Sequence, residues 1–308
     1  MDNNTLAQSR DANRSLARRT FTISMIFVLC LGMGQLSHGA DQKPLKLSPE
    51  VRERCVQILQ DGMHSDEFWP SIHAAEGLTL GGYGDEVIEY LTPKLTTEED
   101  DQKRCGLARE IVRAGDRDKA QIMLEILAGE DPHGHVHAAE SLYKVNELGD
   151  GVAMRKRFQE TDDLRLKLMT AAALARSGDK DALAFLRKML SHEDPELYKV
   201  AAWILGRIGD KTDILRIRRN LSRDADELTH AYHQHSLAAL GDPAGMVALG
   251  KNLQSEDPFV RTYAATFAGD AGATQFADEL IDMLDDPHLD ARYRAAQSLL
   301  FLSRPVVE

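Results

Sequence analysis

Three histidines near the middle of the chain have the residue type and the spacing that could bind a metal ion. His133 and His137 are four residues apart, which places both imidazole rings on one face of a helix, and His135 lies between them. The segment His137–Glu140, however, repeats the segment His73–Glu76, and both read His-Ala-Ala-Glu. The alternative is a histidine that seals a joint between structural repeats by hydrogen bonding, and both interpretations remain open.

A second histidine group comprises His230, His233 and His235. His233 and Gln234 stand where other copies of the repeat described below carry two small residues. Polar bulk at a close-packing position is typical of a functional site or of a loosely packed repeat. His230 and His233 are therefore further metal candidates, about three repeats from the first group. The sequence contains no phosphate loop, dinucleotide fingerprint or nucleophile elbow, so we expect no cofactor.

Seven basic residues recur at two matching positions of four successive predicted helices. One row consists of Lys156, Lys188, Arg219 and Lys251, and the row one position earlier consists of Arg155, Arg187 and Arg218. On a helical wheel Arg219 points away from the apolar Ile214 and Ile217, so the first row faces solvent. The corresponding residues of the flanking repeats are Glu125 and Asp282. The rows suit an anionic partner, although lysine and arginine are also ordinary helix formers on a solvated face.

The helices that carry these residues belong to an internal repeat. A Gly-Asp dipeptide recurs at spacings of 31, 34, 29, 31 and 32 residues, beginning at Gly84, Gly115, Gly149, Gly178, Gly209 and Gly241. In the copy Asp194–Leu221, Asp194 caps a first helix that opens with Pro195, and Gly209 separates it from a second helix. We expect Gly209 to take a positive φ. Neither helix can bury its apolar face alone, so the repeat predicts an all-α solenoid of stacked helix pairs.

The segment Asp257–Ala265 shows the repeat most clearly, with the sequence Asp-Pro-Phe-Val-Arg-Thr-Tyr-Ala-Ala. It resembles the HEAT repeat, in the short form of phycobilin lyase subunits, whose pattern is roughly Asp-Pro-x-Val-Arg-x-x-Ala-Ala-x-x-Leu-Gly-x-x-Gly-Asp. The resemblance covers residues 48 to 303. It implies an armadillo/HEAT-like superhelix of about seven helix pairs, with a lone N-terminal helix and a C-terminal capping helix. It also implies that the second helices, and with them both basic rows, line the concave surface.

The function follows less directly, because HEAT-like repeats serve many unrelated tasks. The basic rows favour a scaffold, not an enzyme, that binds a protein or an acidic polymer on its concave face. The alternative is a metal-dependent enzyme or a lyase-like enzyme subunit built on the same repeats. Among HEAT-like enzymes, deoxyhypusine hydroxylase holds two irons with several His-Glu dipeptides on helices. This chain has one such dipeptide, at His192 in a predicted loop, so we do not expect that activity.

Residues 1–40 differ in kind from the repeats. Four arginines precede an apolar run from Phe21 to Leu36, and Gly39 and Ala40 follow, which is the pattern of a secretory signal peptide. An ordinary Sec signal, a twin-arginine signal at Arg18 and Arg19, and an uncleaved anchor remain open. A linker at 41–47 leads to the solenoid at 48–308. We therefore expect an exported protein, periplasmic or secreted, with no membrane span once the signal is removed.

Composition limits the function further. The chain has 37 basic and 49 acidic side chains, a net charge of −12. Removal of residues 1–40 leaves 33 basic and 47 acidic side chains, a net charge of −14, which argues against general nucleic-acid binding. Cys55 and Cys105 remain after this removal, and both lie on apolar faces of predicted helices. Buried thiols are expected, and a disulfide is the alternative that an exported location permits.

Overall fold

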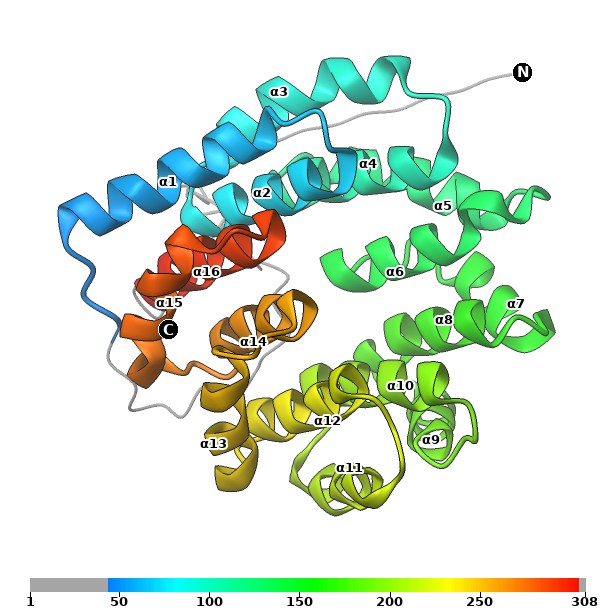
Figure 1. Ribbon diagram of the computed structural model, residues 1–308. Helices are drawn as coiled ribbons and strands as arrows, with labels where there is room; N and C mark the ends of the chain where they lie inside the picture. Colours follow the sequence, from blue (N-terminus) through cyan, green and yellow to red (C-terminus); the bar gives the residue numbers. More distant parts are fainter. Residues whose placement is uncertain (1–43, 305–308) are drawn as a thin grey trace, which may run out of the picture. The chain divides into compact units, whose positions relative to one another are not determined.

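The helices alternate between two layers. The computed structural model describes residues 44–304, which lie within one compact unit of the chain and contain sixteen α-helices and no strand (Figure 1). The inner layer consists of α2 (Phe68–Gly81), α4 (Asp101–Ala114), α6 (His135–Val145), α8 (Leu164–Arg176), α10 (Pro195–Ile208), α12 (Glu227–Ala239), α14 (Pro258–Asp270) and α16 (Leu289–Leu302). The outer layer consists of α1 (Pro49–Met63), α3 (Gly84–Thr97), α5 (Ala120–Ala128), α7 (Val152–Glu160), α9 (Lys180–Met189), α11 (Ile214–Arg219), α13 (Pro243–Asn252) and α15 (Ala277–Asp282).

The inner helices pack side by side in chain order, and the last returns to the first. Helix α16 contacts both α14 and α2 (Figure 1). At this junction the amide of Leu45 donates to the carbonyl of Leu302 over 2.9 Å, and the side chain of Arg304 donates to the carbonyl of Thr79 over 3.0 Å. The predicted all-α solenoid is confirmed, but its ends meet instead of remaining apart. We call the side of the inner helices that faces away from the outer layer the lumen face.

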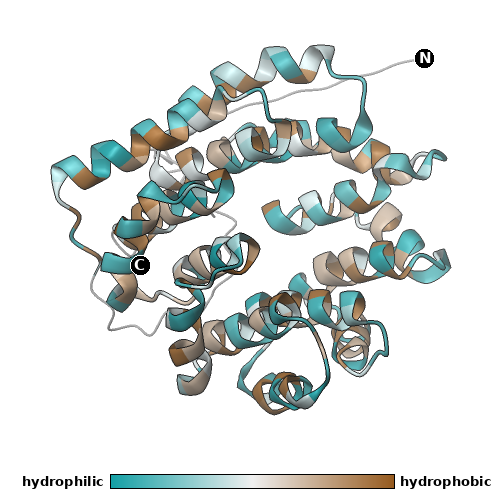
Figure 2. Ribbon diagram, viewed as in Figure 1, coloured by the Kyte–Doolittle hydropathy of each residue, from teal (hydrophilic) through white to brown (hydrophobic). Residues whose placement is uncertain are grey.

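Local sequence explains where the inner helices begin. Asp163, Asp194 and Asp257 occupy N-cap positions, and each accepts a hydrogen bond from a backbone amide of the first turn. Pro195 and Pro258 follow at the first helical position, where the missing amide hydrogen is not needed. Hydrophobic and hydrophilic residues alternate along the ribbons, as expected for helices that are buried on part of their surface (Figure 2).

Small residues determine which helices form the inner layer. Ala201 and Ala202, the two small residues of this repeat copy, are fully buried on α10. Gly206 lies one turn further along, and a Cβ at this position would come within 2.9 Å of the Cα of Ser236 on α12. Helices that carry such residues can approach closely, so they form the shorter, inner circuit, and the outer helices pack into the grooves between them.

The elbows between paired helices are of two kinds. Gly178 has a φ of +97°, in the left-handed region that favours glycine. The predicted positive φ of Gly209 is wrong, because its φ is −78° and its ψ is −171°, which is extended backbone. Glycine is still required there, since a Cβ would come within 2.8 Å of the Oδ2 of Asp213 and closer still to the carbonyl of Leu205. The elbow is tight because Asp213 folds back onto the amide of Asp210 over 3.1 Å.

Several predictions concern the ends of the chain and its cysteines. The predicted signal peptide, residues 1–40, lies outside the described residues, as do 41–43 and 305–308. Residues 44–47 lead into α1 without forming a helix, and no helix of the range 44–304 is long and apolar enough to cross a membrane.

Cys55 and Cys105 are free and buried, and burial raises the pKa of each thiol to about 12.

Candidate functional site

The first predicted basic row lies on the outer helices. Its four residues are exposed, as predicted, and they come from four successive outer helices, α7, α9, α11 and α13. We call Lys156, Lys188, Arg219 and Lys251 the outer basic row. The expectation that the second helix of each pair lines a concave surface is wrong, because the small residues of the first helices place those helices in the inner circuit. Any partner of the outer basic row therefore has to approach from outside the ring of helices.

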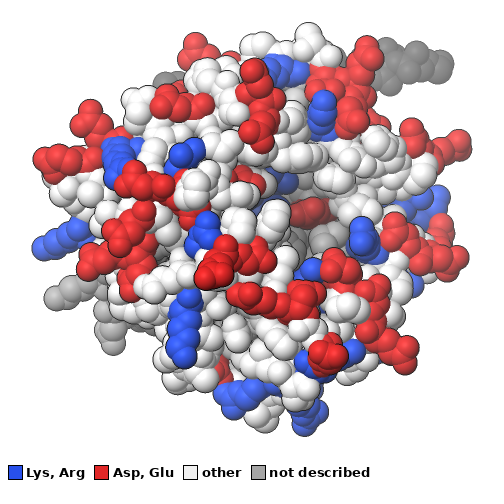
Figure 3. All heavy atoms as spheres, in the orientation of Figure 1, with Lys and Arg blue, Asp and Glu red and all other residues white. Residues whose placement is uncertain are grey.

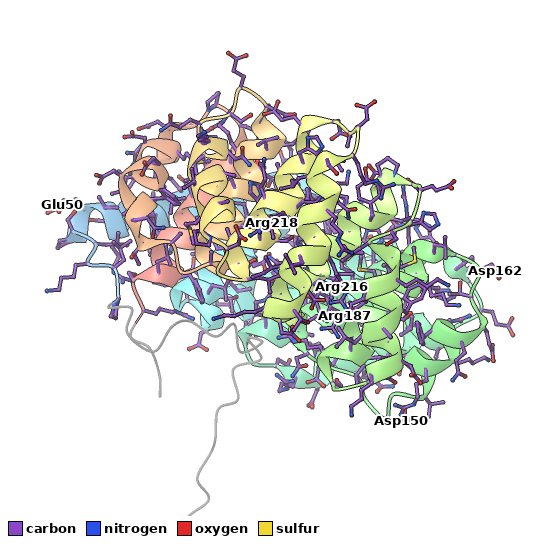
Figure 4. The ribbon with its side chains drawn as sticks, turned by 90° about the horizontal axis from the view of Figure 1, so that it is seen from below. Glu50, Asp150, Asp162, Arg187, Arg216 and Arg218 are labelled. Atoms are coloured by element: carbon purple, nitrogen blue, oxygen red, sulfur yellow. The ribbon has the colours of Figure 1, made fainter. Side chains whose placement is uncertain are left out.

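The second predicted row has structural partners instead of a free surface. Arg187 on α9 pairs with Asp213 over 2.7 Å and with Asp210 over 3.1 Å. Arg218 on α11 pairs with Asp242, the N-cap of α13. Figure 4 shows Arg187 and Arg218 on these neighbouring outer helices. Each arginine thus ties its helix to the elbow of the next repeat.

Arg155, the remaining member of the second row, stays within its own repeat. Its Nη2 donates to the carbonyl of Asp150 over 3.0 Å, at the elbow that precedes α7. This contact and the two ion pairs give the second row a role in holding elbows. The outer basic row is therefore the better candidate for partner binding.

The first histidine group does not converge on a point that could hold a metal ion. The Nε2 of His133 lies 3.2 Å from a carboxylate oxygen of Asp100 at the surface. The ring of His137 stacks on Trp69 of α2 with the centroids 5.3 Å apart. Their different partners separate the two imidazoles that the sequence placed on one helical face.

The second group is held by protein hydrogen bonds. The Nδ1 of His233 donates to the backbone carbonyl of Thr229 over 2.7 Å. Its Nε2 accepts a hydrogen bond from the side-chain Nδ2 of Asn220 over 3.2 Å. Burial lowers the pKa of His233 to about 4 and that of His235 to about 3, so both rings are neutral near pH 7. His230 contacts the carbonyl of Arg223 over 3.0 Å. Within residues 44–304 no three His, Cys, Asp or Glu side chains are placed to hold a metal ion.

The structure reveals a charged cluster on the lumen face that the sequence analysis did not single out. We call it the lumen network. Its ten members are Glu76, Arg109, Glu110, Arg113, Glu140, Lys144, Arg176, Arg207, Asp270 and Arg294. The surface is hollowed near the centre of the face drawn in Figure 3, and acidic and basic side chains are visible inside the hollow. The members of the network come from seven of the inner helices.

Glu76 joins three of those helices. Its carboxylate lies 3.2 Å from Arg113 on α4 and 2.7 Å from Arg294 on α16. Burial alone raises the pKa of Glu76, but the positive charges of the surrounding basic residues, Arg113 first and Arg294 second, hold it well below 4.5. The carboxylate is therefore ionised near pH 7, and it stabilises the junction between the two ends of the array.

Helix α4 contributes a fully buried acid to the same network. Glu110 is not exposed at all, and it pairs with Arg109 over 2.5 Å and with Arg113. The Nη2 of Arg109 is buried and has no hydrogen-bond partner in the described part of the chain. One buried donor of the network, the Nη2 of Arg109, therefore has no hydrogen-bond acceptor among residues 44–304.

The other ion pairs of the network are reached by water. Lys144 and Glu140 on α6 are 2.7 Å apart, with 19% and 28% of their side chains exposed. Burial raises the pKa of Glu140, but Lys144 outweighs it and lowers the pKa to about 2. Arg207 on α10 lies 2.6 Å from Asp270 on α14 and spans the intervening α12, with exposures of 20% and 22%. Charged groups that pack deep inside the ring and still meet solvent line an accessible space.

A sequence signal for part of this network exists in the repeat itself. Arg113, Arg176 and Arg207 each stand two residues before an elbow glycine, in the tripeptide motif Arg-x-Gly followed by Asp. Lys144 occupies the matching turn of α6. The pattern was readable, but only the packing shows that this turn faces the lumen and not solvent.

One comparison with known proteins, that with family models, agrees with the repeat architecture over part of the chain. The family model described as HEAT repeats matches residues 152–234. A search among curated protein sequences found no match. Among solved structures, the complex of CpcE and CpcF of phycocyanin lyase from Nostoc sp. PCC7120 is similar, with 18% identity, coverage of 78% of this chain and 83% of that chain, and a TM-score of 0.44. Human deoxyhypusine hydroxylase is also similar, with 16% identity, coverage of 82% and 97%, and a TM-score of 0.38.

An engineered protein gives a further similarity, with 17% identity, coverage of 83% of this chain and 97% of that chain, and a TM-score of 0.33. The HEAT-repeat match covers the helices from α7 into α12, and the helix pairs on either side of it continue the same arrangement. Residues 152–234 therefore match the HEAT-repeat family, within a chain that folds as a solenoid of helix pairs.

Proposed function

We propose that the protein is an exported scaffold, without catalytic activity, that binds an acidic protein segment or another anionic polymer along the outer basic row. One observation carries this proposal. Its four residues are exposed on successive helices, and no ion pair of any of them is found within residues 44–304, whereas the adjacent row, typified by Arg187, is paired with elbow aspartates. The outer basic row is thus available to a partner on a chain that is otherwise strongly acidic.

The spacing of the row suits an extended partner. Adjacent helices pack about 10 Å apart, so an anionic chain can meet one basic residue on each helix. A single exposed charge contributes little, and salt screens it beyond about 10 Å. The row therefore acts collectively, and binding weakens steeply as the ionic strength rises.

Reversing two charges of the row tests this proposal. We expect Lys188→Glu combined with Arg219→Glu to abolish retention on a heparin or polyglutamate column at low salt, while the thermal unfolding midpoint stays close to that of the wild type. The two side chains are exposed, so the substitution replaces attraction by repulsion without disturbing the core.

The matched control reverses two exposed lysines outside the row, Lys180→Glu and Lys211→Glu, and changes the net charge by the same amount. The control should elute close to the wild type. Equal loss of retention in both variants would show that net charge alone governs binding, and failure of the wild type to bind either polyanion would refute the proposed partner class.

The proposed export of the protein leads to a separate prediction about its mature N-terminus. We expect the mature protein to begin near Ala40 or Asp41 and to be recovered outside the cytoplasm, because the apolar run before this point has the pattern of a cleaved signal. Intact-mass measurement of protein from the exported and cytoplasmic fractions checks this. A soluble cytoplasmic protein that retains residues 1–40 would contradict it.

The enzymatic alternative draws no support from the imidazoles. These imidazoles lie against separate protein groups: His133 contacts the carboxylate of Asp100, and the others contact an aromatic ring or backbone carbonyls. No three ligand side chains gather around any of the four candidates, His133, His137, His230 and His233, within residues 44–304. Elemental analysis of the purified mature protein bears directly on this point, since stoichiometric zinc or iron would favour the enzyme over the scaffold.

A further inference from the structure

Four outer helices carry an exposed apolar residue one turn before their member of the outer basic row. We call these four positions the apolar row: Val152, Ala184, Leu215 and Val247. Each stands four residues before the basic residue of the same helix, which is α7, α9, α11 or α13. Residues four apart lie on one face of an α-helix, so the two rows run side by side on one surface of the outer layer.

The apolar row is strongly exposed. Val152 and Leu215 are each 62% exposed, and Val247 is 61% exposed. The row thus contains three of the five large hydrophobic side chains that are exposed within residues 44–304. Single apolar residues scattered over a surface need no explanation, but a row in register with a row of charges does.

Both rows end at the same helices. On α5, the outer helix before α7, the two matching positions are Gln121 and Glu125. On α15, the outer helix after α13, they are Asp278 and Asp282. An apolar and a basic residue therefore occur together on four helices and are replaced together on the helices at either side. A merely solvated face gives no reason for the two positions to change together, so the rows indicate one surface with one role.

We propose that the two rows together bind an extended polypeptide segment that carries both acidic and apolar side chains. This inference rests on the proposed function, because it identifies the anionic partner as a polypeptide. The outer basic row attracts the carboxylates of the segment, and the apolar row removes its aliphatic side chains from water. A sulfated polysaccharide or polyglutamate meets only the first requirement, since neither brings an aliphatic side chain to the apolar row.

The curvature of the ring favours an extended chain over a flat or rigid partner. The inner helices form a closed circuit, and Figure 1 shows α7, α9, α11 and α13 following its bend. Successive outer helices therefore face different directions, so a bilayer surface or a straight helix can touch only some of the four. An extended peptide can follow the bend, and three of its residues span the distance of about 10 Å between adjacent helices.

Two synthetic peptides of equal length and charge separate apolar from electrostatic binding. One contains four copies of Glu-Leu-Ser and the other contains four copies of Glu-Ser-Ser, and both are capped at each end and carry the same dye. Fluorescence anisotropy with the wild-type mature protein at low salt measures both affinities. We expect the Glu-Leu-Ser peptide to bind at least about tenfold more tightly, because its leucines reach the apolar row. Equal affinities of the two peptides would refute the inference.

Two variants change the apolar row in opposite directions. Leu215→Gln combined with Val247→Gln removes two apolar side chains, so the preference for the Glu-Leu-Ser peptide should fall to about twofold or less. Ala184→Leu enlarges the smallest member of the row and should tighten binding of the same peptide about threefold. All three positions are exposed, and Gln and Leu are good helix formers, so the fold should be retained. An unchanged preference in the double variant would overturn the inference, as would a lack of tightening in Ala184→Leu.

The matched control is Phe259→Gln, which removes an exposed apolar side chain of α14 outside both rows. Its preference between the two peptides should equal that of the wild type. Equal loss of the preference in Phe259→Gln and in the double variant would mean that the leucines do not recognise the apolar row, and the assignment would be wrong.

Vesicles test another class of partner that is both anionic and apolar. We expect the wild type not to sediment with vesicles of phosphatidylserine and phosphatidylcholine at physiological salt. Sedimentation that is lost in Leu215→Gln/Val247→Gln would assign the two rows to a lipid surface and overturn the inference.

The variants also separate this inference from the proposed function. Lys188→Glu/Arg219→Glu should weaken binding of both peptides and lose heparin retention. Leu215→Gln/Val247→Gln should keep heparin retention and its affinity for the Glu-Ser-Ser peptide. If the wild type is retained on heparin but binds the two peptides equally, only the inference fails. If neither heparin nor polyglutamate retains the wild type, the proposed function itself fails.

Discussion

Replacement of Glu76 by Gln should lower the free energy of unfolding by about 3 kcal/mol, because removal of one partner from a buried ion pair leaves the others uncompensated. The affected partners are Arg113, 3.2 Å away, and Arg294, 2.7 Å away. Both belong to helices other than α2, so the substitution loosens the junction between α2, α4 and α16 simultaneously. Urea denaturation followed by circular dichroism measures the change.

The pH dependence of this effect has a defined sign. The pKa of Glu76 lies well below 4.5 in the folded protein, so its contribution is fully present above the unfolded value and is lost as the pH falls through the folded value. Wild type and Glu76→Gln should therefore converge in stability in the acid range below pH 4.5. The exposed Glu53→Gln on α1 serves as the control and should change stability by less than about 0.5 kcal/mol. A stability gap that is undiminished in acid would refute the role of the charge.

Replacement of Gly206 by Val should destabilise the protein by a similar amount, about 3 kcal/mol, through overpacking. A Cβ at this position would lie 2.9 Å from both the Cα and the Cβ of Ser236, so α10 and α12 would have to separate. The backbone of α12 cannot give way locally, because α12 also packs against α13 and α14. Thermal unfolding monitored by calorimetry measures the change.

The control for Gly206→Val is Ala184→Val, which introduces the same β-branched residue at an exposed position of α9. Only the helix propensity changes there, at a cost of about 0.5 kcal/mol. Similar destabilisation by both variants would mean that propensity, and not the contact between α10 and α12, sets the effect of Gly206→Val.

The repeat was readable from the sequence because each copy carries its own local signals. The Asp-Pro pair at Asp194 begins α10 as predicted, and the matching pair at Asp257 begins α14. The alanines that follow in each copy are buried. The hydrophobic pattern does not tell the layers apart, because both helices of a pair are amphipathic. Only the small residues, such as Gly206, distinguish the helix that must approach its neighbours most closely.

The junction of the ends could not be predicted, because no local pattern encodes it. It depends on the sum of small rotations over all repeats and on contacts such as that between Glu76 and Arg294, which are 218 residues apart in the chain. The two candidate sites differ in the same way, since one could be predicted from local sequence and the other depends on contacts between distant helices. The outer basic row was found because its exposure follows from one helical wheel, and the lumen network was missed because its members come from seven helices.

The contact between α16 and α2 also fixes how many repeats this protein can have. In an open solenoid each repeat contacts its neighbours, so copies can be gained or lost during evolution without disturbing the rest. Here each inner helix contributes a share of a full turn, as each strand does in a closed β-barrel. Loss of one helix pair would leave a gap between α16 and α2 and would separate Glu76 from Arg294. Copy number in this array is therefore set by geometry, and homologous chains of this type must change it by steps that restore closure or abandon the ring.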